Sequence, residues 1–299
     1  MDENREVVTP PKWRFTGIQD TGVITNARSF YLSETRQTPR ESPVTNERES
    51  QVKGILSALQ EYAMNELGID LRERLPNESD IHFFDPKQWK IFCKQEGMTR
   101  DNPAMNIASG KIYVEEDPDL RLTLQNTGHE LIHVVSATNI YSRVDPKDSA
   151  AIKTSISHQG FHNYENDALL SLDEAITEIT NIQLVTNYWL KNDKLSGLDW
   201  SGHDSVGYIK TLVIVDGLIK KVAEQQRVGY LDVLKTLQRG KLLGQMQSLR
   251  VLTTAIGKDY MGKLARLSDE NVIELRQFAL DLGLTDTVQK LGLISKKCW

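Results

Sequence analysis

The amino-acid sequence predicts an α+β fold that is predominantly helical, with one small sheet and a helical C-terminal half. Helices are predicted because apolar residues recur at helical spacing from Val52 to Leu67, and because nearly all of the chain after Gly207 keeps the same period. Strands are predicted because β-branched and aromatic residues gather in two short segments, IHFFDPKQWKIF and residues 111–115. The fold class follows from these helical regions and the short strands between them.

The composition is that of a globular protein. The chain has 299 residues, of which 26% are charged and 39% hydrophobic. Its formal net charge of -5 offers no basic excess for a phosphate backbone, so nucleic acid is not expected as a partner. The N-terminus lacks an apolar segment behind a basic flank, and no stretch of about 18 apolar residues occurs, so neither a signal peptide nor a membrane span is expected. Two distant cysteines, Cys93 and Cys298, exclude a disulfide framework and favour a cytoplasmic location.

Two regions are predicted along the chain. Residues 1–48 are polar with isolated aromatics and are expected to be mostly disordered, since such a stretch buries too little apolar area to offset the entropy of ordering it. The aromatics leave room for part of it to dock or to form a strand. Residues 49–299 are expected to be the folded domain. Its first part, residues 49–137, holds a helix that ends at Gly68, the small sheet and a central helix, and residues 138–299 hold an insert, a second central helix and the C-terminal helices.

The two central helices are predicted over about residues 118–137 and 170–190, with a polar insert of roughly thirty residues between them. The strand at 111–115 follows Gly110 and comes just before the first of these helices. We expect it to be the edge strand of the small sheet and to pack on that helix.

The first central helix carries the sequence His129-Glu130-Leu131-Ile132-His133, which is the HExxH pattern. Residues four apart project from one helix face one turn apart, so both imidazoles can reach a single zinc ion. Glu130 is turned about 100° from His129, which places its carboxylate near a metal-bound water without making it a ligand. Zinc lowers the pKa of such a water to about 7, and Glu130 is in the position of the general base that takes its proton.

A third ligand must come from elsewhere in the chain. Metzincins use a histidine six residues after the second one, with a glycine midway, but those positions are Asn139 and Ser136 here, which excludes that class. In the second central helix, Glu174 and Glu178 lie one turn apart and point the same way. One carboxylate can bind the metal and the other can hold a ligand histidine by its second ring nitrogen. Alternatively, Ser171 and Glu174 fit a capping box that only starts the helix.

The two motifs together, HELIH and Leu172-Asp-Glu-Ala-Ile-Thr-Glu178, resemble those of the gluzincin metallopeptidases, which include the thermolysin-like enzymes. The resemblance covers roughly residues 110–190 and implies that Glu174 is the third zinc ligand and Glu178 the acid behind a ligand histidine. Forty residues separate His133 from Glu174, about twice the interval in thermolysin-like enzymes. A polar surface insert of this kind leaves the site intact.

A hydrogen-bond donor for the tetrahedral oxyanion is also expected, because gluzincins often use a tyrosine or a histidine for it. Tyr164 lies ten residues before Glu174, Tyr208 opens the helical region that follows Gly207, and His203 lies in the loop before it. Tyr164 and Tyr208 rank equally and His203 third, with ordinary surface or packing roles as the alternative for each.

The remaining histidines with a bearing on the metal, His158 and His162, are expected to be solvent-exposed loop residues. The predicted function is zinc-dependent hydrolysis of peptide bonds, with a peptide or protein as substrate. Two alternatives remain: a non-proteolytic metal-binding or regulatory protein that retains a gluzincin-like site, and a helical interaction protein with an accidental motif. The intact Glu130 favours the enzyme, because metal binding alone needs no base.

Overall fold

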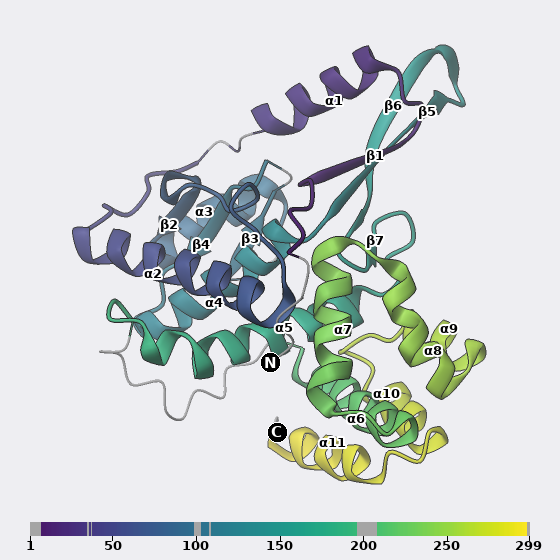
Figure 1. Cartoon of the computed structure of the whole chain (residues 1–299). Coiled ribbons are helices and arrows are strands. Elements are labelled where there is room, and N and C mark those ends of the chain that lie inside the picture. Colours follow the sequence, from purple (N-terminus) through teal and green to yellow (C-terminus); the bar gives the residue numbers. More distant parts are fainter. Residues whose placement is uncertain are drawn as a thin grey trace. The chain divides into compact units, whose positions relative to one another are not determined.

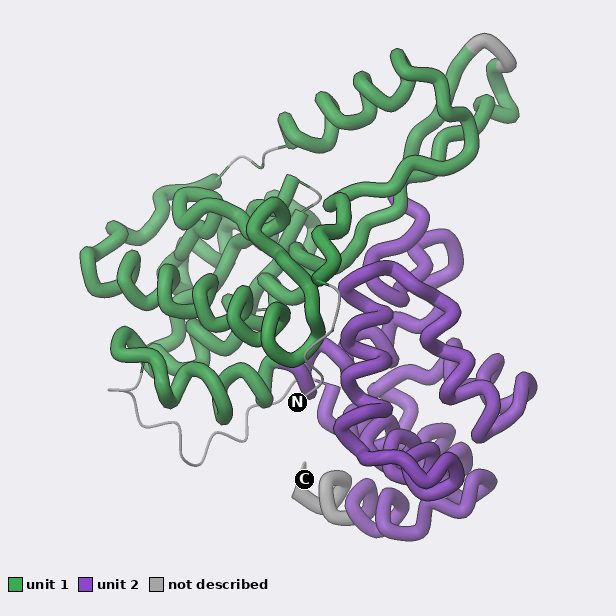
Figure 2. The backbone as a smooth tube through the Cα atoms, viewed as in Figure 1, with its two compact units in different colours: residues 1–155, 181–205 green, residues 156–180, 206–299 purple. Residues whose placement is uncertain are grey.

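The computed structural model describes residues 7–34, 36, 38–98, 103–107, 109–195 and 208–297. The chain divides into two units, each described below by itself (Figure 2). Unit 1 comprises residues 1–155 and 181–205, and unit 2 comprises residues 156–180 and 206–299. The α+β class is confirmed, with small sheets and a helical C-terminal half (Figure 1). No helix among the described residues is long and apolar enough to span a membrane.

Unit 1 begins its main body with the helix that the sequence predicted. Helix α2 (Asn46–Tyr62) starts at the N-cap Thr45, whose side chain accepts a hydrogen bond from the Arg48 N–H, and continues as the π-helical turn η1 (Ala63–Leu67). The chain leaves this helix at Gly68, which has the left-handed conformation (φ 65°) that favours glycine. The buried face of α2 carries the apolar residues that gave the helical period, among them Val52, Ile55, Leu59 and Tyr62.

The small sheet of unit 1 contains three strands in the order β2-β4-β3, with bounds Ile81–Phe84 for β2, Ile112–Glu115 for β4 and Ala104–Asn106 for β3. Strand β4 pairs parallel with β2 and antiparallel with β3. The prediction that residues 111–115 form the edge strand is therefore wrong: they form the central strand, and β3 is the edge strand that packs on the HExxH helix. A three-residue strand is too short to show a sequence period, which is why β3 was not predicted.

An aromatic cluster covers one face of this sheet. Helix α3 (Pro86–Glu96) is capped by Asp85, whose carboxylate accepts hydrogen bonds from two backbone N–H groups of its first turn. The helix buries its apolar residues against the strands in a cluster made of Phe84, Trp89, Phe92, Cys93, Ile107 and Tyr113. Aromatic side chains bury large apolar areas, so burial of this cluster stabilises the packing of α3 on the sheet. Cys93 is thus a buried core residue, whereas Cys298 lies outside the described residues.

The HExxH motif lies within helix α4 (Leu120–Val135), as predicted. Its N-cap is Asp119, whose carboxylate accepts a hydrogen bond from the Arg121 N–H, and the helix ends at Ser136. Helix α4 packs against β3, β4 and α2. Leu131, Ile132, Val134 and Val135 are buried, so the motif is carried by a helix that is fixed on its apolar sides.

The polar insert between the two central helices forms strands. A second sheet has the order β1-β5-β6-β7, in which β5 (Thr138–Asp145) and the long strand β6 (Asp148–Gln159) are joined by a short turn. Strand β7 (His162–Asn163) pairs antiparallel with the end of β6. Both ends of the insert lie close in sequence to the helices that carry His133 and Glu174: β5 begins five residues after His133, and β7 ends eleven residues before Glu174.

Part of the N-terminal segment is ordered secondary structure, although residues 1–48 were predicted to be mostly disordered. Strand β1 (Trp13–Gly17) pairs parallel with β5, and helix α1 (Thr21–Ser33) follows it. The Val8 N–H donates to the Gly68 carbonyl, and the Asp70 N–H donates to the Val8 carbonyl. Backbone pairing with residues far along the chain fixes part of this segment, and Ala27 and Tyr31 of α1 are buried. Composition alone does not report on such pairing.

Arg74 is a buried guanidinium that ties the N-terminal segment to helix α4. Its side chain is 1% exposed and donates hydrogen bonds to the carbonyls of Pro10, Pro11 and Val135. Burial lowers its pKa to about 10, with a smaller contribution from Arg14, so the group remains charged at neutral pH. The positive charge at the last turn of α4 also complements the helix dipole.

We expect Arg74→Met to lower the free energy of unfolding by about 3 kcal/mol, because three backbone carbonyls, two of them on buried residues, lose a charged donor. Urea unfolding followed by circular dichroism measures this. The matched control is Arg276→Met, since Arg276 is an exposed residue of the helical C-terminal half and the unfolding midpoint of this variant should change little. Equal midpoints for the two variants would contradict a structural role for Arg74.

Unit 2 is built from helices around one apolar core. Its helices after residue 207 are α6 (Ile209–Gln226), α7 (Tyr230–Leu243), α8 (Arg250–Ile256), α9 (Lys258–Leu264), α10 (Val272–Asp281) and α11 (Thr285–Lys297), with the 3-10 turn η4 (Met246–Leu249) before α8. The core draws on α6 and α7 and on the first part of α5 (Leu170–Asn187). Helix α5 begins in unit 2 and ends in unit 1, where the 3-10 turn η3 (Trp189–Lys191) follows it.

Candidate metal centre

Two imidazoles of helix α4 converge on one point. The Nε2 atoms of His129 and His133 lie 3.2 Å apart, and the two rings are inclined by 59°. His133 is buried and His129 is partly buried. Since these residues occupy positions i and i+4 of an unbroken helix, the local backbone alone brings their ring nitrogens together. This part of the prediction rests on helical geometry and is reproduced in the structure.

Helix α5 supplies the carboxylate. The helix begins at Leu170, after Leu169 in the left-handed conformation (φ 66°), and the Asp173 N–H bonds to the Leu169 carbonyl. Leu169 is therefore the N-cap, and Ser171 lies inside the helix. Ser171 is therefore not the N-cap that a capping box with Glu174 would require.

His129, His133 and Glu174 form a cluster that could hold a metal ion. One ligand atom from each residue lies within 4.8 Å of the other two. Two imidazole nitrogens and one carboxylate oxygen make three donors, which leaves a fourth position open around a tetrahedral ion. Among the described residues, these three make up the group of histidine, cysteine and acidic side chains whose ligand atoms lie this close together.

Comparison with protein-family models, with curated proteins and with solved structures finds no match for this chain. The candidate metal site is therefore inferred from the geometry of its own residues.

A close contact inside unit 1 holds α5 against α4 next to the histidines. The Asn181 side-chain amide donates to the Gln125 carbonyl at 3.0 Å. A Cβ atom at Gly128 would lie 2.6 Å from the Asn181 side-chain oxygen and 2.9 Å from the ring of Trp189, so only glycine fits here. Within α5, Asn181 lies two turns after Glu174 and therefore on the same face of the helix.

We expect Gly128→Ala to lower the free energy of unfolding by about 1–3 kcal/mol, because the added methyl group overpacks the contact between α4 and α5. Gly262→Ala is the matched control in helix α9, where a Cβ atom meets nothing within 4 Å. The control should raise the free energy of unfolding by up to about 1 kcal/mol through helix propensity. Chemical denaturation of both variants measures the difference, and a gain for Gly128→Ala would contradict the close contact.

The predicted base, Glu130, has a partner that the sequence did not indicate. The side-chain amide of Asn106, at the end of the edge strand β3, lies with its Nδ2 2.6 Å from Glu130 Oε2. Both side chains are partly buried. The contact joins residues 24 positions apart through strand pairing, so no local sequence signal could have revealed it.

The first turn of α5 is fixed from inside unit 2. Asp173 and Lys241 form an ion pair in which both side chains are 1% exposed. The second carboxylate oxygen of Asp173 accepts the Phe161 N–H at 2.7 Å, and Gly160 (φ 57°) leaves the space for this carboxylate. A buried carboxylate with both oxygens engaged is held in one orientation. The residue directly before Glu174 is thus immobilised, and one turn later Glu178 is 7% exposed on the same helix.

The three candidate oxyanion donors have different surroundings. Tyr164 is 47% exposed, and its hydroxyl donates to the Gln159 side-chain oxygen at 2.9 Å. Tyr208 is 38% exposed and occupies the N-cap of α6 in the left-handed conformation (φ 53°), which is strained for a bulky side chain. His203 lies outside the described residues. The role of these residues as oxyanion donors stays a prediction.

The expectation for His162 as an exposed loop residue is wrong. The residue is 8% exposed, its Nε2 lies 3.3 Å from Asp167 Oδ1, and its ring centroid lies 4.2 Å from that of Tyr164. His158 is partly buried beside Ser157, and burial lowers its pKa. Both histidines lie on the paired strands β6 and β7, and strand pairing is what removes them from solvent.

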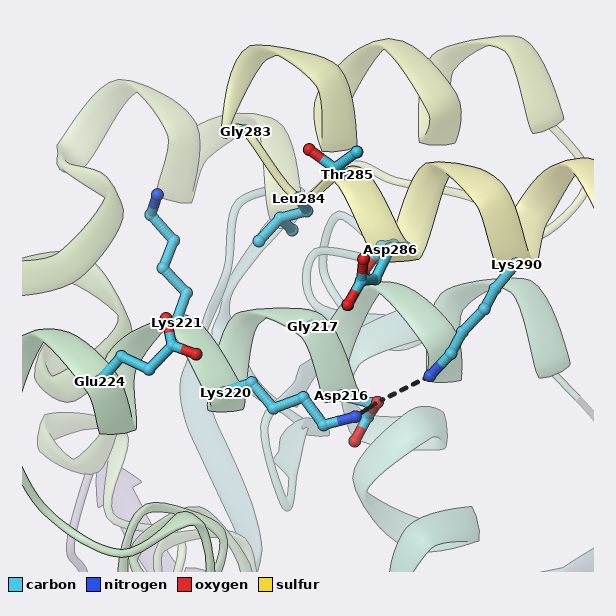
Figure 3. A pocket seen from close by; sticks show the side chains of 11 residues that line it. Asp216, Gly217, Lys220, Lys221, Glu224, Gly283, Leu284, Thr285, Asp286 and Lys290 are labelled. Carbon is cyan, nitrogen blue, oxygen red and sulfur yellow. Dashed lines mark hydrogen bonds and ion pairs between the residues drawn. The ribbon is translucent and has the colours of Figure 1, made fainter.

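Unit 2 also contains a polar pocket of about 280 Å³ that shares no residue with the metal cluster (Figure 3). Helix α6 and the start of α11 line it. Lys220 and Lys290 reach the same Asp216 carboxylate oxygen at 2.6 and 3.7 Å, and Lys221 donates to the Leu282 carbonyl. The hydrogen bond to Asp216 raises the pKa of Lys220. Each of these three lysines therefore contacts a protein group of its own unit.

Proposed function

We propose that this protein is a zinc-dependent peptidase of the gluzincin type. The observation that carries the proposal is the convergence of His129, His133 and Glu174, with Glu130 next to the first histidine on the same helix. A chain that only stores a metal has no need of a carboxylate beside the open position. Glu130 is the residue that turns a metal site into a hydrolytic one.

The distances and the donor set fit zinc. With Zn–N bonds of about 2.0–2.1 Å and tetrahedral angles, two ligand nitrogens lie about 3.3 Å apart. The Nε2 atoms of His129 and His133 are 3.2 Å apart, which agrees with this edge length. Two histidines and one glutamate are also the ligand set of catalytic zinc sites that keep one position for water. Magnesium and calcium sites use oxygen donors almost exclusively, so the two nitrogens argue against those ions.

Each residue then has a defined task. His129, His133 and Glu174 hold the ion, which when bound makes water acidic and polarises a carbonyl group. Glu130 accepts the proton of the attacking water and passes it to the leaving amine. Glu178, buried one turn after Glu174, holds a ligand histidine in the ring orientation that presents Nε2. Tyr208 or Tyr164 donates a hydrogen bond to the oxyanion.

The substrate is a peptide or protein chain in extended form. The edge strand β3 lies on α4, and β3 ends at the residue that contacts Glu130. A peptide added beside β3 would run past the base and would be held mainly by backbone hydrogen bonds. Binding by strand addition selects a peptide in the extended conformation and gives little selectivity for its side chains.

Incubation of the full chain with a peptide library tests the proposal. Cleavage products are identified by mass spectrometry without additions, after treatment with a chelator, and after zinc is restored. We expect cleavage that disappears with the chelator and returns with zinc. Zinc binding without cleavage of any peptide would support the non-proteolytic alternative instead, and cleavage that persists in the chelator would exclude the metal from the reaction.

A further inference from the structure

The base Glu130 has one hydrogen bond to the described part of the chain, and Asn106 makes it. Asn106 Nδ2 donates to Glu130 Oε2 at 2.6 Å. Among the described residues, no side chain or backbone group bonds to Oε1 of this carboxylate. The two oxygens of Glu130 are therefore unequal: one is held by an amide and one is available.

Strand geometry aims Asn106 at this carboxylate. In β3, Met105 pairs with Tyr113 and packs with Ile107 on the aromatic cluster, which lies on one face of the sheet. Since side chains alternate along a strand, Asn106 points to the opposite face, where α4 lies. The backbone of Asn106 is registered against Ile112 of the central strand. The amide group thus starts from a position fixed by the sheet and not by a loop.

A hydrogen-bonded turn follows the end of β3. The Ile107 N–H donates to the Lys111 carbonyl, and the Gly110 N–H donates to the Ile107 carbonyl. Gly110 has φ 97°, a conformation that glycine adopts without strain. This turn anchors the strand directly after Asn106. A group on such a support orients its partner more precisely than one on a mobile loop.

The chemistry of an asparagine suits this place. Its oxygen would repel an ionised carboxylate, so the amide nitrogen must face Glu130. An amide donor also carries no charge, so it orients the carboxylate without forming an ion pair that would compete for the attacking water. A lysine or arginine here would form such a pair.

We propose that Asn106 is a positioning residue for the general base: its amide holds Oε2 of Glu130 and leaves Oε1 as the oxygen that takes the proton. This rests on the proposed peptidase function. The side-chain hydrogen bond of Asn106 is made to the base, so its loss should slow the chemical step while zinc stays bound.

The test compares Asn106→Ala and Asn106→Asp with the wild-type chain. Without the amide, Glu130 samples unproductive orientations, and loss of one charge-assisted hydrogen bond corresponds to a fall in kcat of about 10- to 100-fold. Asn106→Asp places a second carboxylate beside Glu130, and kcat should fall further. KM should stay within about threefold and zinc content should not change.

Asn139→Asp is the matched control in unit 1. Asn139 is also partly buried, but its amide donates to the Thr16 hydroxyl at 3.1 Å, and kcat should be unchanged in this variant. In a Glu130→Gln background, Asn106→Ala should cause no further loss, because the base it positions is gone. A rise in KM with unchanged kcat, or an equal loss in both backgrounds, would overturn the proposal.

A second readout separates this proposal from the proposed function. The side-chain amide signal of Asn106 in a nitrogen-15 NMR spectrum should shift in Glu130→Ala, while that of Asn139 stays in place. An unmoved Asn106 signal would overturn the hydrogen bond itself. If the wild-type chain cleaves no peptide but the Asn106 signal shifts, the peptidase proposal fails and the contact between Asn106 and Glu130 stands.

Discussion

Glu130→Gln is expected to keep one zinc ion per chain and to lose hydrolysis by at least about 10³-fold in kcat. The substitution preserves the shape of the side chain and its hydrogen bond with Asn106 through the amide oxygen, so folding and metal binding should not change. What disappears is an oxygen that can take a proton from water. Rates on a cleavable peptide and zinc content by elemental analysis measure the two effects separately.

The control for this variant is Glu61→Gln, which makes the same chemical change at an exposed position of α2. Its rate should equal that of the wild type. If Glu130→Gln kept a tenth or more of the wild-type rate, the role of Glu130 as general base would be untenable.

Glu174→Ala is expected to lower zinc affinity at least about 100-fold, because the ion is left with two protein ligands. Glu178→Ala should have a smaller effect, since a residue that only supports a ligand histidine contributes about 10- to 100-fold. Competition with a chromogenic chelator gives the affinities. A larger loss of zinc affinity in Glu174→Ala than in Glu178→Ala would identify Glu174 as the metal ligand and Glu178 as the supporting carboxylate.

Glu165→Ala serves as the control for the Glu174 variant. Glu165 is an exposed acid in the chain segment before α5, and zinc affinity should not respond to its loss. Wild-type affinity in Glu174→Ala, or a greater loss in Glu178→Ala, would reassign the third ligand.

The sequence predicted what depends on local periodicity. HELIH could be placed on a helix because its apolar neighbours Leu131 and Ile132 fit the helical period, and the helix in turn brings His129 and His133 together. Glu174 followed from a second motif on a second helix. The helical C-terminal half was predicted in the same way, from the recurrence of apolar residues on one face of each helix.

What depends on pairing between distant segments could not be predicted. The contact between Asn106 and Glu130 requires β3 to pair with β4 and to pack on α4, and a three-residue strand leaves no period in the sequence. The central position of β4 depends on its parallel pairing with β2, and the ordering of β1 depends on its pairing with β5. Register is set by the packed faces of the sheet, which a single sequence does not display.

The insert between the ligand helices shows the same limit. Residues 138–159 have the composition of a polar insert, yet they form the two long strands β5 and β6. Alternation of polar and apolar residues over such strands is weak when one face of the sheet has little core to cover. For the same reason, burial of His162 could not be read from its neighbours.

The most direct test of the central claim is the zinc content of the purified chain after reconstitution with zinc and removal of loosely bound metal. Elemental analysis is made on the wild type and on the double variant His129→Ala, His133→Ala, with circular dichroism to confirm that both are folded. The cluster geometry predicts one zinc per chain in the wild type and none in the variant. A wild-type chain without zinc, or equal zinc in both proteins, would contradict it.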